Sequence, residues 1–396
     1  MSAPRLAGTV RERILSLARE KGQVSRGEIS QAFSMDKKAV SVAVDRLLSE
    51  GILAVNGVRE SRSGRRREIL AVNGSHAATV GIDLGATHVI GVLADLSGTV
   101  LDRASYDIRP GLPVALILDQ MRTIAARLVS TPRGGGARAI GVCVPGFVHP
   151  VEGTSLVAEN IPGWKDVRIR DALQEGLGLP VRVEDASRAL AVGERWLGKA
   201  RGERDFLVLD LGFGIGMGIF IGGSLYRGTG WKSGEIGHTV VDPRGLPCAC
   251  GGRGCLETVA SGRAIARQAA EGIRDGRSQL LGELTKGNAG VVTAQDVGVA
   301  AGMSDPFAME LLEAAGSAAG LALANAAAIL NPSVVVLGGG LVSSGRVFLD
   351  AIWKSADRHL MPGMRQDLRI VESELGLDGS ARGMALIASE RIFSGT

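Results

Sequence analysis

The chain has 396 residues, of which 45% are hydrophobic and 22% charged, a balance that excludes a disordered chain and predicts two or three folded domains. Its net charge of +4 is uneven, because residues 1–75 hold 14 basic and 8 acidic side chains while the rest of the chain is slightly negative. No stretch has the uninterrupted apolar run of a membrane-spanning helix or a secretion signal, so we expect a cytoplasmic protein without membrane contact.

The N-terminal head, residues 1–75, begins with three predicted helices joined by short links. The first covers residues 9–21, and the second opens with a capping box formed by Ser25 and Glu28. The third begins at the capping residue Asp36 and ends at Gly51. Its predicted buried stripe consists of Ala39, Val40, Ala43, Val44, Leu47 and Leu48. Three helices in this order are typical of a helix-turn-helix.

A β-hairpin is predicted after the third helix. Residues 52–55 form an apolar run, Asn56-Gly57 predicts the turn, and residues 68–72 form the returning strand. The segment between the strands is rich in arginine. A basic hairpin beside a recognition helix is typical of a wing that contacts the DNA backbone or the minor groove. We therefore expect residues 1–75 to form a winged helix-turn-helix DNA-binding domain.

The expected contacts with double-stranded operator DNA come from the start of the third helix and from the wing. They are Lys37, Lys38, Ser41, Arg62, Arg65, Arg66 and Arg67. For Lys37 and Lys38 alone, a charged helix face that only meets solvent explains the pattern equally well. The order of helices, the charge asymmetry and the arginine-rich hairpin together indicate DNA binding.

From residue 78 onward, three glycine loops follow predicted strands. The first is Asp83-Leu84-Gly85-Ala86-Thr87, the second spans residues 209–216 and the third spans residues 334–340. Such loops let the backbone approach a phosphate, and Asp83 could hold a hydrated magnesium ion. No single loop is specific, but three in this order resemble the phosphate and adenosine motifs of actin-like sugar kinases. The residues they would offer a nucleotide are Asp83, Gly85, Thr87, Gly212, Gly214, Gly338 and Gly339.

A metal-binding pattern lies between the second and third loops. His238 is followed by Cys248, Cys250 and Cys255, with glycines that allow tight turns between the last two cysteines. One imidazole and three thiolates complete a tetrahedral zinc set with no open position, which is typical of a structural site. The alternative is three structural or redox cysteines beside an unrelated histidine. Cys143, in an apolar run, is expected in the core.

The same stretch carries a resemblance to a known family. Glu235-Ile236-Gly237-His238, followed by the C-x-C-G-x-x-G-C-x-E pattern from Cys248 to Glu257, resembles the signature of the ROK family of repressors, open reading frames and kinases. The resemblance covers roughly residues 78–396, and the head matches the repressor branch. It implies an α/β, two-lobed actin-like sugar-kinase (ribonuclease H-like) fold with a structural zinc site. The small lobe would be about 76–187 plus the C-terminal helix, and the large lobe about 188–380.

The resemblance also implies a sugar site in the cleft between the lobes. Its contacts would be Asn160, Glu184, Asp185, Glu235, His238 and Glu257. Asp185 matches the base that removes the proton of the phosphorylated hydroxyl, if kinase activity is retained. Taken individually, Glu257 could be only a helix-start carboxylate and Asn160 only a turn residue.

Two positions depart from the kinases. Phe213 stands where they carry threonine, which removes a hydroxyl donor to phosphate, and Glu184 stands where they carry asparagine. We therefore expect a sugar-responsive DNA-binding regulator, a repressor with a sugar or sugar-phosphate effector, acting as a homodimer or dimer of dimers. ATP and magnesium enter only if kinase activity survives. The alternatives are an active ATP-dependent hexose kinase with a DNA-binding head, and a regulator that responds only to a protein partner.

Overall fold

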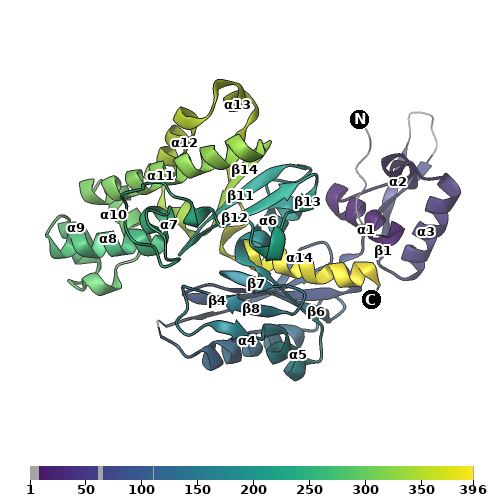
Figure 1. Ribbon diagram of the computed structural model, residues 1–396. Helices are drawn as coiled ribbons and strands as arrows, with labels where there is room; N and C mark the ends of the chain where they lie inside the picture. The colour runs from purple at the N-terminus through teal and green to yellow at the C-terminus, as the bar shows by residue number, and fades with distance from the viewer. Residues whose placement is uncertain (1–8, 61–65, 110, 396) are drawn as a thin grey trace. The chain divides into compact units, whose positions relative to one another are not determined.

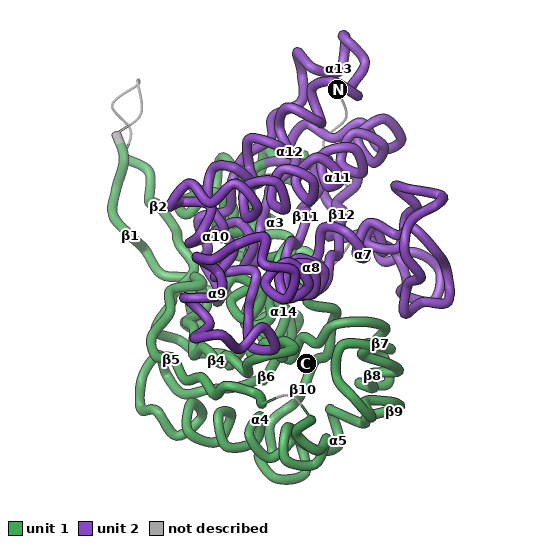
Figure 2. Tube along the Cα trace, turned by 90° about the vertical axis from the view of Figure 1, so that its left-hand side faces the viewer, with its two compact units in different colours: residues 1–202, 378–396 green, residues 203–377 purple. Residues whose placement is uncertain are grey.

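The computed structural model describes residues 9–60, 66–109 and 111–395. The chain forms two compact units, drawn in different colours in Figure 2: unit 1 contains residues 1–202 and 378–396, and unit 2 contains residues 203–377. The sequence analysis assigned residues 188–202 to the large lobe. In the structure helix α6 (Ala186–Leu197) lies in unit 1, because it packs along the C-terminal helix α14 (Gly379–Ser394).

Unit 1 contains the head, a five-stranded sheet and a three-stranded sheet. Besides α6 and α14, its helices are α1 (Val10–Lys21), α2 (Arg26–Phe33), α3 (Lys37–Ser49), η1 (Gly74–His76), α4 (Val114–Val129) and α5 (Ile169–Leu177). Its strands are β1 (Leu53–Glu60), β2 (Arg66–Val72), β3 (Ala78–Leu84), β4 (His88–Asp95), β5 (Val100–Asp107), β6 (Ala137–Val144), β7 (Phe147–His149), β8 (Thr154–Val157), β9 (Lys165–Val167) and β10 (Val181–Asp185).

The head forms the three helices in the predicted places. Ser25 and Glu28 make the expected capping box on α2, and the Asp36 side chain accepts bonds from the first amides of α3. Ala39 is exposed rather than buried, because it lies in the first turn of α3, before the helix reaches the core. The buried α3 side chains are Val40, Val44 and Leu47.

The hairpin of the head differs from the prediction. Asn56-Gly57 does not form the turn: β1 continues to Glu60, and Val55 pairs with Leu70 while Val58 pairs with Glu68. Asn56 and Gly57 therefore stand opposite the single residue Ile69 and form a β-bulge, and Gly57 adopts the left-handed φ of 110° that favours glycine. The loop between the strands lies outside the described residues.

The central sheet of unit 1 has the strand order β10-β6-β3-β4-β5, with β4 antiparallel to both β3 and β5 and the remaining pairs parallel. Helix α14 lies on one face and α4 on the other (Figure 1). Glycines allow these close contacts, since a Cβ at Gly81 would overlap the backbone of α14 and one at Gly91 would overlap Ile124 of α4. Strands β7, β8 and β9 form the smaller sheet.

The head shares a core with the rest of unit 1. Leu96 and Phe393 are buried in the same cluster as Ile14, Leu15 and the other apolar residues of the head. The Arg11 guanidinium donates to the carbonyl of Phe393 at 2.8 Å, which ties α1 to the end of α14. The head is therefore packed onto α14 and is not connected by the chain alone.

Unit 2 holds a second five-stranded sheet, in the order β13-β12-β11-β14-β15. Its strands are β11 (Phe206–Leu211), β12 (Ile215–Ile221), β13 (Ser224–Leu225), β14 (Val334–Gly338) and β15 (Arg369–Glu372). Its helices are η2 (Thr229–Trp231), η3 (Ile236–His238), α7 (Glu257–Ala260), α8 (Gly262–Arg274), α9 (Gln279–Leu284), η4 (Ala289–Val291), α10 (Ala294–Gly302), α11 (Pro306–Leu330), η5 (Gly340–Ser344), α12 (Arg346–His359), α13 (Pro362–Asp367) and η6 (Gly376–Asp378), the last of which reaches the boundary with unit 1.

Helix α11 is long and apolar enough, by length and composition, to cross a membrane. Such helices also form the cores of soluble proteins, and 56% of the apolar window of α11 is buried within the structure. Its glycines Gly316 and Gly320 allow the backbone of α12 to approach closely. These contacts identify α11 as the central helix of the unit 2 core.

Candidate functional site

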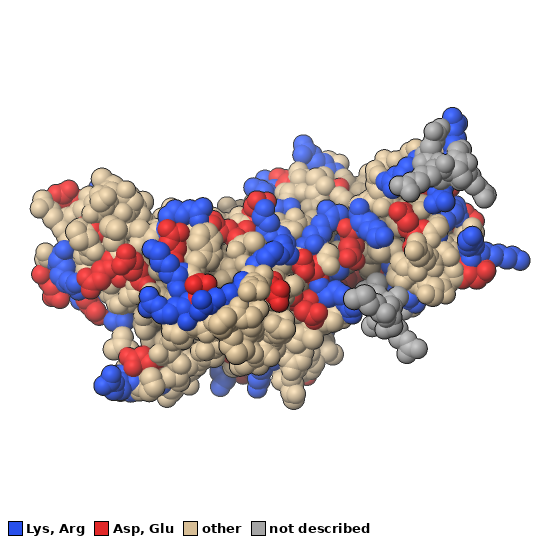
Figure 3. Space-filling view, turned by 90° about the horizontal axis from the view of Figure 1, so that it is seen from above, with Lys and Arg blue, Asp and Glu red and all other residues tan. Residues whose placement is uncertain are grey.

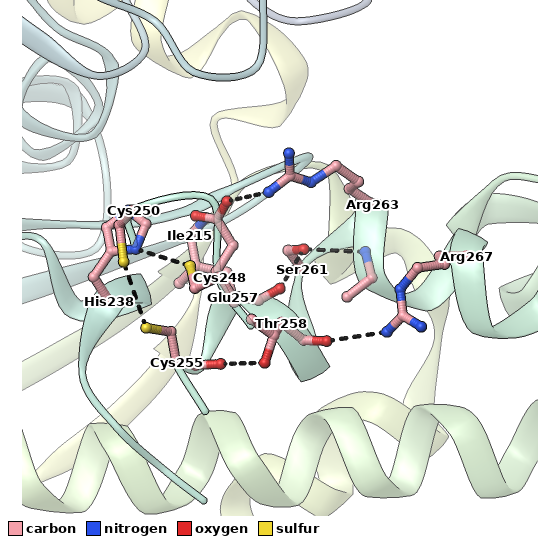
Figure 4. Close-up of polar contacts among 11 residues, drawn as sticks. Ile215, His238, Cys248, Cys250, Cys255, Glu257, Thr258, Ser261, Arg263 and Arg267 are labelled. Atoms are coloured by element: carbon pink, nitrogen blue, oxygen red, sulfur yellow. Dashed lines mark hydrogen bonds and ion pairs between the residues drawn. The ribbon is translucent and has the colours of Figure 1, made fainter. Parts of the chain in front are cut away.

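The four residues of the predicted metal site come together in unit 2. Figure 4 shows His238, Cys248, Cys250 and Cys255 gathered together. Their ligand atoms all lie within 4.8 Å of one another. The Cys248 Sγ lies 3.5 Å from His238 Nδ1, and the Cys250 Sγ lies 3.7 Å from the Cys255 Sγ. A zinc tetrahedron with bonds of about 2.0–2.3 Å has edges of about 3.3–3.8 Å. The donor set could therefore hold a metal ion such as zinc, and Nδ1 is the His238 ring nitrogen beside the Cys248 thiol.

Short backbone bonds hold the loop that carries the thiols. The Cys248 amide donates to the Gly252 carbonyl at 2.9 Å, and the Val241 amide donates to the Gly254 carbonyl at 2.9 Å. Gly254 has a φ of 70°, and a Cβ there would overlap the carbonyl oxygen of Asp242. Burial and the neighbouring thiols raise the pKa of Cys255 to about 12. A divalent cation is the ordinary means of holding such thiols as thiolates.

Glu257, the first residue of α7, follows the metal loop directly. It is buried, and its Oε1 accepts a bond from Arg263 Nη2 at 3.1 Å (Figure 4). Its Oε2 accepts a bond from the Ile215 amide at 3.4 Å. Glu235 is half-buried and precedes η3, which ends in His238. The sequence analysis missed Arg263. Arg263 follows Glu257 by six residues, which is not the spacing of neighbours on one helix. The two residues also lie on different helices, since α7 ends at Ala260 and α8 begins at Gly262.

The Glu184–Asp185 pair lies at the end of β10 and the start of α6 in unit 1. The Asp185 carboxylate caps α6 by accepting a bond from the Arg188 amide at 3.0 Å. Glu184 Oε1 lies 2.8 Å from Arg188 Nε, and both side chains are only 2% exposed. Burial raises the pKa of Asp185, with a smaller contribution from Glu184 that Arg188 opposes. Glu184 therefore forms a buried ion pair with Arg188, which the sequence did not predict.

The first glycine loop follows β3 in unit 1. Asp83 is buried and accepts a hydrogen bond from the Cys143 thiol at 3.3 Å. Cys143 lies in the core, as expected, but its thiol also makes this polar contact. The ring of His88 lies 3.8 Å from Asp83, and Gly85 leaves room for it. His88 is not among the residues that the sequence predicted for a site. In the structure its pKa is raised, first by the hydrogen bond with Asp83 and against the effect of burial.

The His88–Asp83 pair makes stability depend on pH. Because the folded-state pKa of His88 is raised, its contribution is complete below about pH 6.5 and is lost as the pH rises through the folded value. With the imidazole about one-third exposed, we expect less than about 1 kcal/mol. Urea unfolding at pH 6.0 and 8.5 will show a larger difference between wild type and His88→Gln at pH 6.0. Equal differences at both pH values would contradict the pairing.

The other two glycine loops lie in unit 2. Gly212 and Gly214 form the turn between β11 and β12, where the Gly212 amide donates to the Gly214 carbonyl at 3.0 Å. Phe213, between them, is 40% exposed. Gly338 ends β14, and Gly339 has a φ of 84° with its Cα against the Leu211 carbonyl, so no larger residue fits there.

Asn160 lies in the loop between β8 and β9. That loop is held by bonds from Ile161 to Ala158 and from Trp164 to Ile161, while Trp164 Nε1 donates to Ser155 Oγ at 2.9 Å. The Asn160 side-chain oxygen is buried and has no hydrogen-bond partner in the described part of the chain. A buried acceptor without a donor is costly.

The predicted DNA-contacting residues lie on α3 and β2. Lys37, Lys38, Arg66 and Arg67 are exposed, and Ser41 is half-buried. Arg62 and Arg65 lie outside the described residues. Figure 3 shows Lys and Arg side chains on the surface of the head, at the right-hand end of that view. Arg26 of α2, which the sequence analysis did not single out, pairs with Asp45 at 2.7 Å and so neutralises the one acid on the exposed face of α3.

The family of the chain follows from comparison with known proteins. A sequence model of the ROK family matches residues 79–391. The chain belongs to the ROK family. This confirms the family and the α/β sugar-kinase-like fold expected from the sequence.

The relatives of this ROK protein include both repressors and kinases. It is 28% identical over 370 residues to the xylose repressor of Bacillus spizizenii, an alignment that covers 93% of this chain and 91% of the repressor. It is 34% identical over 307 residues to the glucokinase of Halalkalibacterium halodurans, covering 77% of this chain and 92% of the kinase. Among solved structures, a ROK family transcriptional regulator that is a homologue of the E. coli MLC protein has a TM-score of 0.79 at 26% identity, with 97% of this chain and 96% of that chain covered.

Proposed function

We propose that this ROK protein is a sugar-responsive transcriptional repressor. The observation that carries the proposal is the extent of the repressor alignment: at 93% of the chain, it includes most of the head as well as the kinase-like part. The glucokinase alignment covers only 77% of the chain. The regulator of known structure likewise covers both parts. A cytoplasmic homodimer or dimer of dimers fits this function, because paired heads read two half-sites on operator DNA.

The head, residues 1–75, is the proposed winged helix-turn-helix domain. Exposed Lys37 and Lys38 at the first turn of α3 would meet bases and phosphates, with Ser41 one turn further. Arg66 and Arg67 at the start of β2, together with Arg62 and Arg65, would contact the backbone from the wing. The Arg26–Asp45 pair supports this proposal, since it removes an acidic charge that would repel DNA.

We propose that sugar hydroxyls bond to Asn160, Asp185, Glu235, His238 and Glu257. The unpartnered buried oxygen of Asn160 supports this role. His238 would bind zinc through Nδ1 and leave its other ring nitrogen for a hydroxyl, which gives the zinc-bound imidazole its usual second partner. Structural zinc, held by His238, Cys248, Cys250 and Cys255, would supply a rigid anchor for the loop that leads into Glu257. Glu184 is the least suitable contact, because Arg188 already holds its carboxylate.

An ATP-dependent hexose kinase remains the second candidate. Its support is the glucokinase relatives together with the retained Asp83, Gly85, Thr87 and Asp185. Gly212, Gly214, Gly338 and Gly339 would cradle the nucleotide if it binds. Phe213 opposes this candidate, because a partly exposed ring occupies the glycine turn and offers no hydroxyl to phosphate.

One experiment separates the two candidates. Purified protein is mixed with a randomised duplex library, the retained DNA is sequenced, and its affinity is measured with and without a panel of sugars. A repressor will retain one sequence class, at least about 1,000-fold tighter than random DNA, and one sugar will release it. If the protein instead phosphorylates a sugar with release of ADP and retains no DNA sequence, the kinase becomes the better-supported function.

The wing variant tests how DNA is held. Replacing Arg66 and Arg67 with alanine is expected to weaken binding to all duplexes and to lower the slope of log affinity against log salt by about 1–2. Arg168→Ala, on an exposed arginine of unit 1 outside the head, is the matched control and will leave the slope unchanged. An unchanged slope in the double variant would show that these arginines do not touch phosphate.

A further inference from the structure

A cavity of about 460 Å³ lies within unit 1, where the head packs against α6, the β4–β5 turn and α14. Four of its lining side chains are arginines: Arg19 from α1, Arg103 from β5, Arg201 after α6 and Arg382 from α14. No acidic side chain lines it among the described residues. Trp196, Leu197, Val72 and Val100 form apolar parts of the wall. The cavity contains none of the residues assigned to sugar, nucleotide, zinc or DNA.

Arg19 is the most deeply placed of the four arginines. It is 7% exposed, and its Nη2 donates to the Leu96 carbonyl at 3.2 Å and to Ser389 Oγ at 2.6 Å. Its Nε is buried without a hydrogen-bond partner, and no carboxylate lies within ion-pair distance of it in the described part of the chain. Burial lowers the pKa of Arg19 to about 10, opposed by the more distant charges of Glu390 and Asp95. A guanidinium buried in this way is short of an anion.

Two of the other three lining arginines also lack a carboxylate partner in the described part of the chain. Arg382 Nε is also buried and unpartnered among the described residues. Arg201 donates only to backbone carbonyls, those of Glu20 at 2.9 Å and Arg19 at 3.5 Å. Arg103 alone has a carboxylate, that of Asp378 at 2.6 Å. The lining therefore holds three guanidinium groups without a paired carboxylate.

Three acidic groups near the cavity have hydrogen-bond or ion-pair partners of their own. Asp95 accepts bonds from the amides of Ser97 and Thr99 and from the Ser97 hydroxyl, which closes the β4–β5 turn. Glu20 pairs with Arg195 at 3.1 Å, and Asp378 pairs with Arg103. Positive charge is thus concentrated on a concave, partly apolar surface.

We propose that this cavity binds a phosphate-bearing small molecule, at a site separate from the sugar residues. Guanidinium groups bond phosphate through two parallel N–H donors, which would satisfy the unpartnered Nε atoms of Arg19 and Arg382. The volume exceeds that of a phosphate group alone and suits a ligand of the size of a phosphorylated monosaccharide, whose carbon skeleton can lie against Trp196. A DNA backbone is a poor occupant, because Arg19 is almost fully buried.

Occupancy of the site would strengthen the packing of the head. The lining comes from α1 and β2 of the head and from α6 and α14 of the body, so a bound anion contacts both parts at once. Because such a ligand binds the head while it is packed against the body, its binding free energy stabilises that packing. Phosphate binding does not depend on the proposed repressor function, so a failure of one is distinguishable from a failure of the other.

Calorimetric titration of the full chain with inorganic phosphate, glucose 6-phosphate and glucose tests the proposal. We expect both phosphates to bind, glucose 6-phosphate more tightly, and each to raise the unfolding temperature. Arg382→Gln is expected to weaken phosphate binding at least about tenfold, because it removes a charge-assisted bond. Thr99→Glu, at an exposed position on the rim, places a negative charge there and should weaken phosphate binding without disturbing the fold. Arg168→Gln, the control, should bind as wild type does.

Two further measurements show where phosphate binds. Asn160→Ala should leave phosphate binding unchanged if the anion occupies the arginine cavity. Absence of heat and of thermal shift with both phosphates would overturn the proposal. So would equal binding by wild type, Arg382→Gln and Thr99→Glu, or loss of binding in Asn160→Ala, which would assign the phosphate to the sugar residues. Binding of short DNA duplexes at this surface without any binding of the small phosphates would also refute it.

Discussion

Cys255→Ser is expected to abolish zinc binding and to destabilise unit 2 by at least about 3 kcal/mol, because structural zinc contributes its binding energy to folding. Cys255 is 2% exposed and its Sγ lies 3.7 Å from that of Cys250, so a serine would leave three ligands and a polar gap in a buried site. Zinc content by mass spectrometry and urea unfolding provide the two measurements. Sugar binding should fall with stability, since Glu257 follows Cys255 by two residues.

Cys143→Ser is the matched control for the zinc prediction. Cys143 is buried in unit 1 and belongs to no metal cluster among the described residues, so this variant should keep one zinc per chain. Full zinc content in Cys255→Ser, or none in wild-type protein purified without chelators, would refute the metal assignment.

Glu184→Asn is expected to destabilise the protein by about 3–5 kcal/mol. The substitution would leave the Arg188 guanidinium, 2% exposed, without the carboxylate that lies 2.8 Å away. Removing one partner of a buried ion pair leaves an uncompensated charge, which costs far more than the net contribution of the pair. Because the charge of Glu184 contributes to the raised pKa of Asp185, its removal should also lower the pKa of that carboxyl. Urea denaturation of wild type and variant gives the difference in free energy.

A double variant distinguishes an ion pair from a general loss of packing. Replacing Glu184 and Arg188 together with methionine removes both charges, so it should recover most of the stability lost in Glu184→Asn. An unfolding midpoint in Glu184→Asn equal to that of wild type would contradict the prediction.

The ion pair also changes how kinase activity should be sought. Glu184→Asn restores the residue that the family's kinases carry, but it breaks a buried contact and would lower activity by unfolding. Phe213→Thr restores the hydroxyl at a partly exposed turn and leaves Glu184 in place. Sugar phosphorylation by this single variant, removed by Asp185→Asn, is the cleaner sign of a latent kinase site.

Removal of the head is less simple than the sequence suggested. The sequence predicted that residues 1–75 fold as a domain independent of the rest of the chain. Phe393 and Leu96 share the buried cluster of the head, so truncation would expose both to water. Substitutions on the surface of the head are therefore better tests of DNA binding than its deletion.

The sequence by itself determined the features that depend on local spacing. The helix caps at Ser25 and Asp36, the strand-turn-strand at Asp83 and the metal set from His238 to Cys255 could all be predicted, because their residues are close along the chain and their chemistry is specific. The hairpin was located but its turn was wrong, since Asn-Gly can form a bulge as readily as a turn and only strand pairing chooses between them.

Only the tertiary structure decided which charges meet. Arg188 reaches Glu184 across the junction of β10 and α6, His88 folds back onto Asp83, and Arg19 and Arg382 meet at one cavity although 363 positions separate them. Glu184 and Arg188 have the i, i+4 spacing of helical neighbours, but Glu184 lies in strand β10, so spacing alone did not predict the pair. The other two contacts follow no periodicity, because they depend on how a strand ends and where α14 packs. Burial then sets the strength of each interaction, and burial is a property of the folded chain alone.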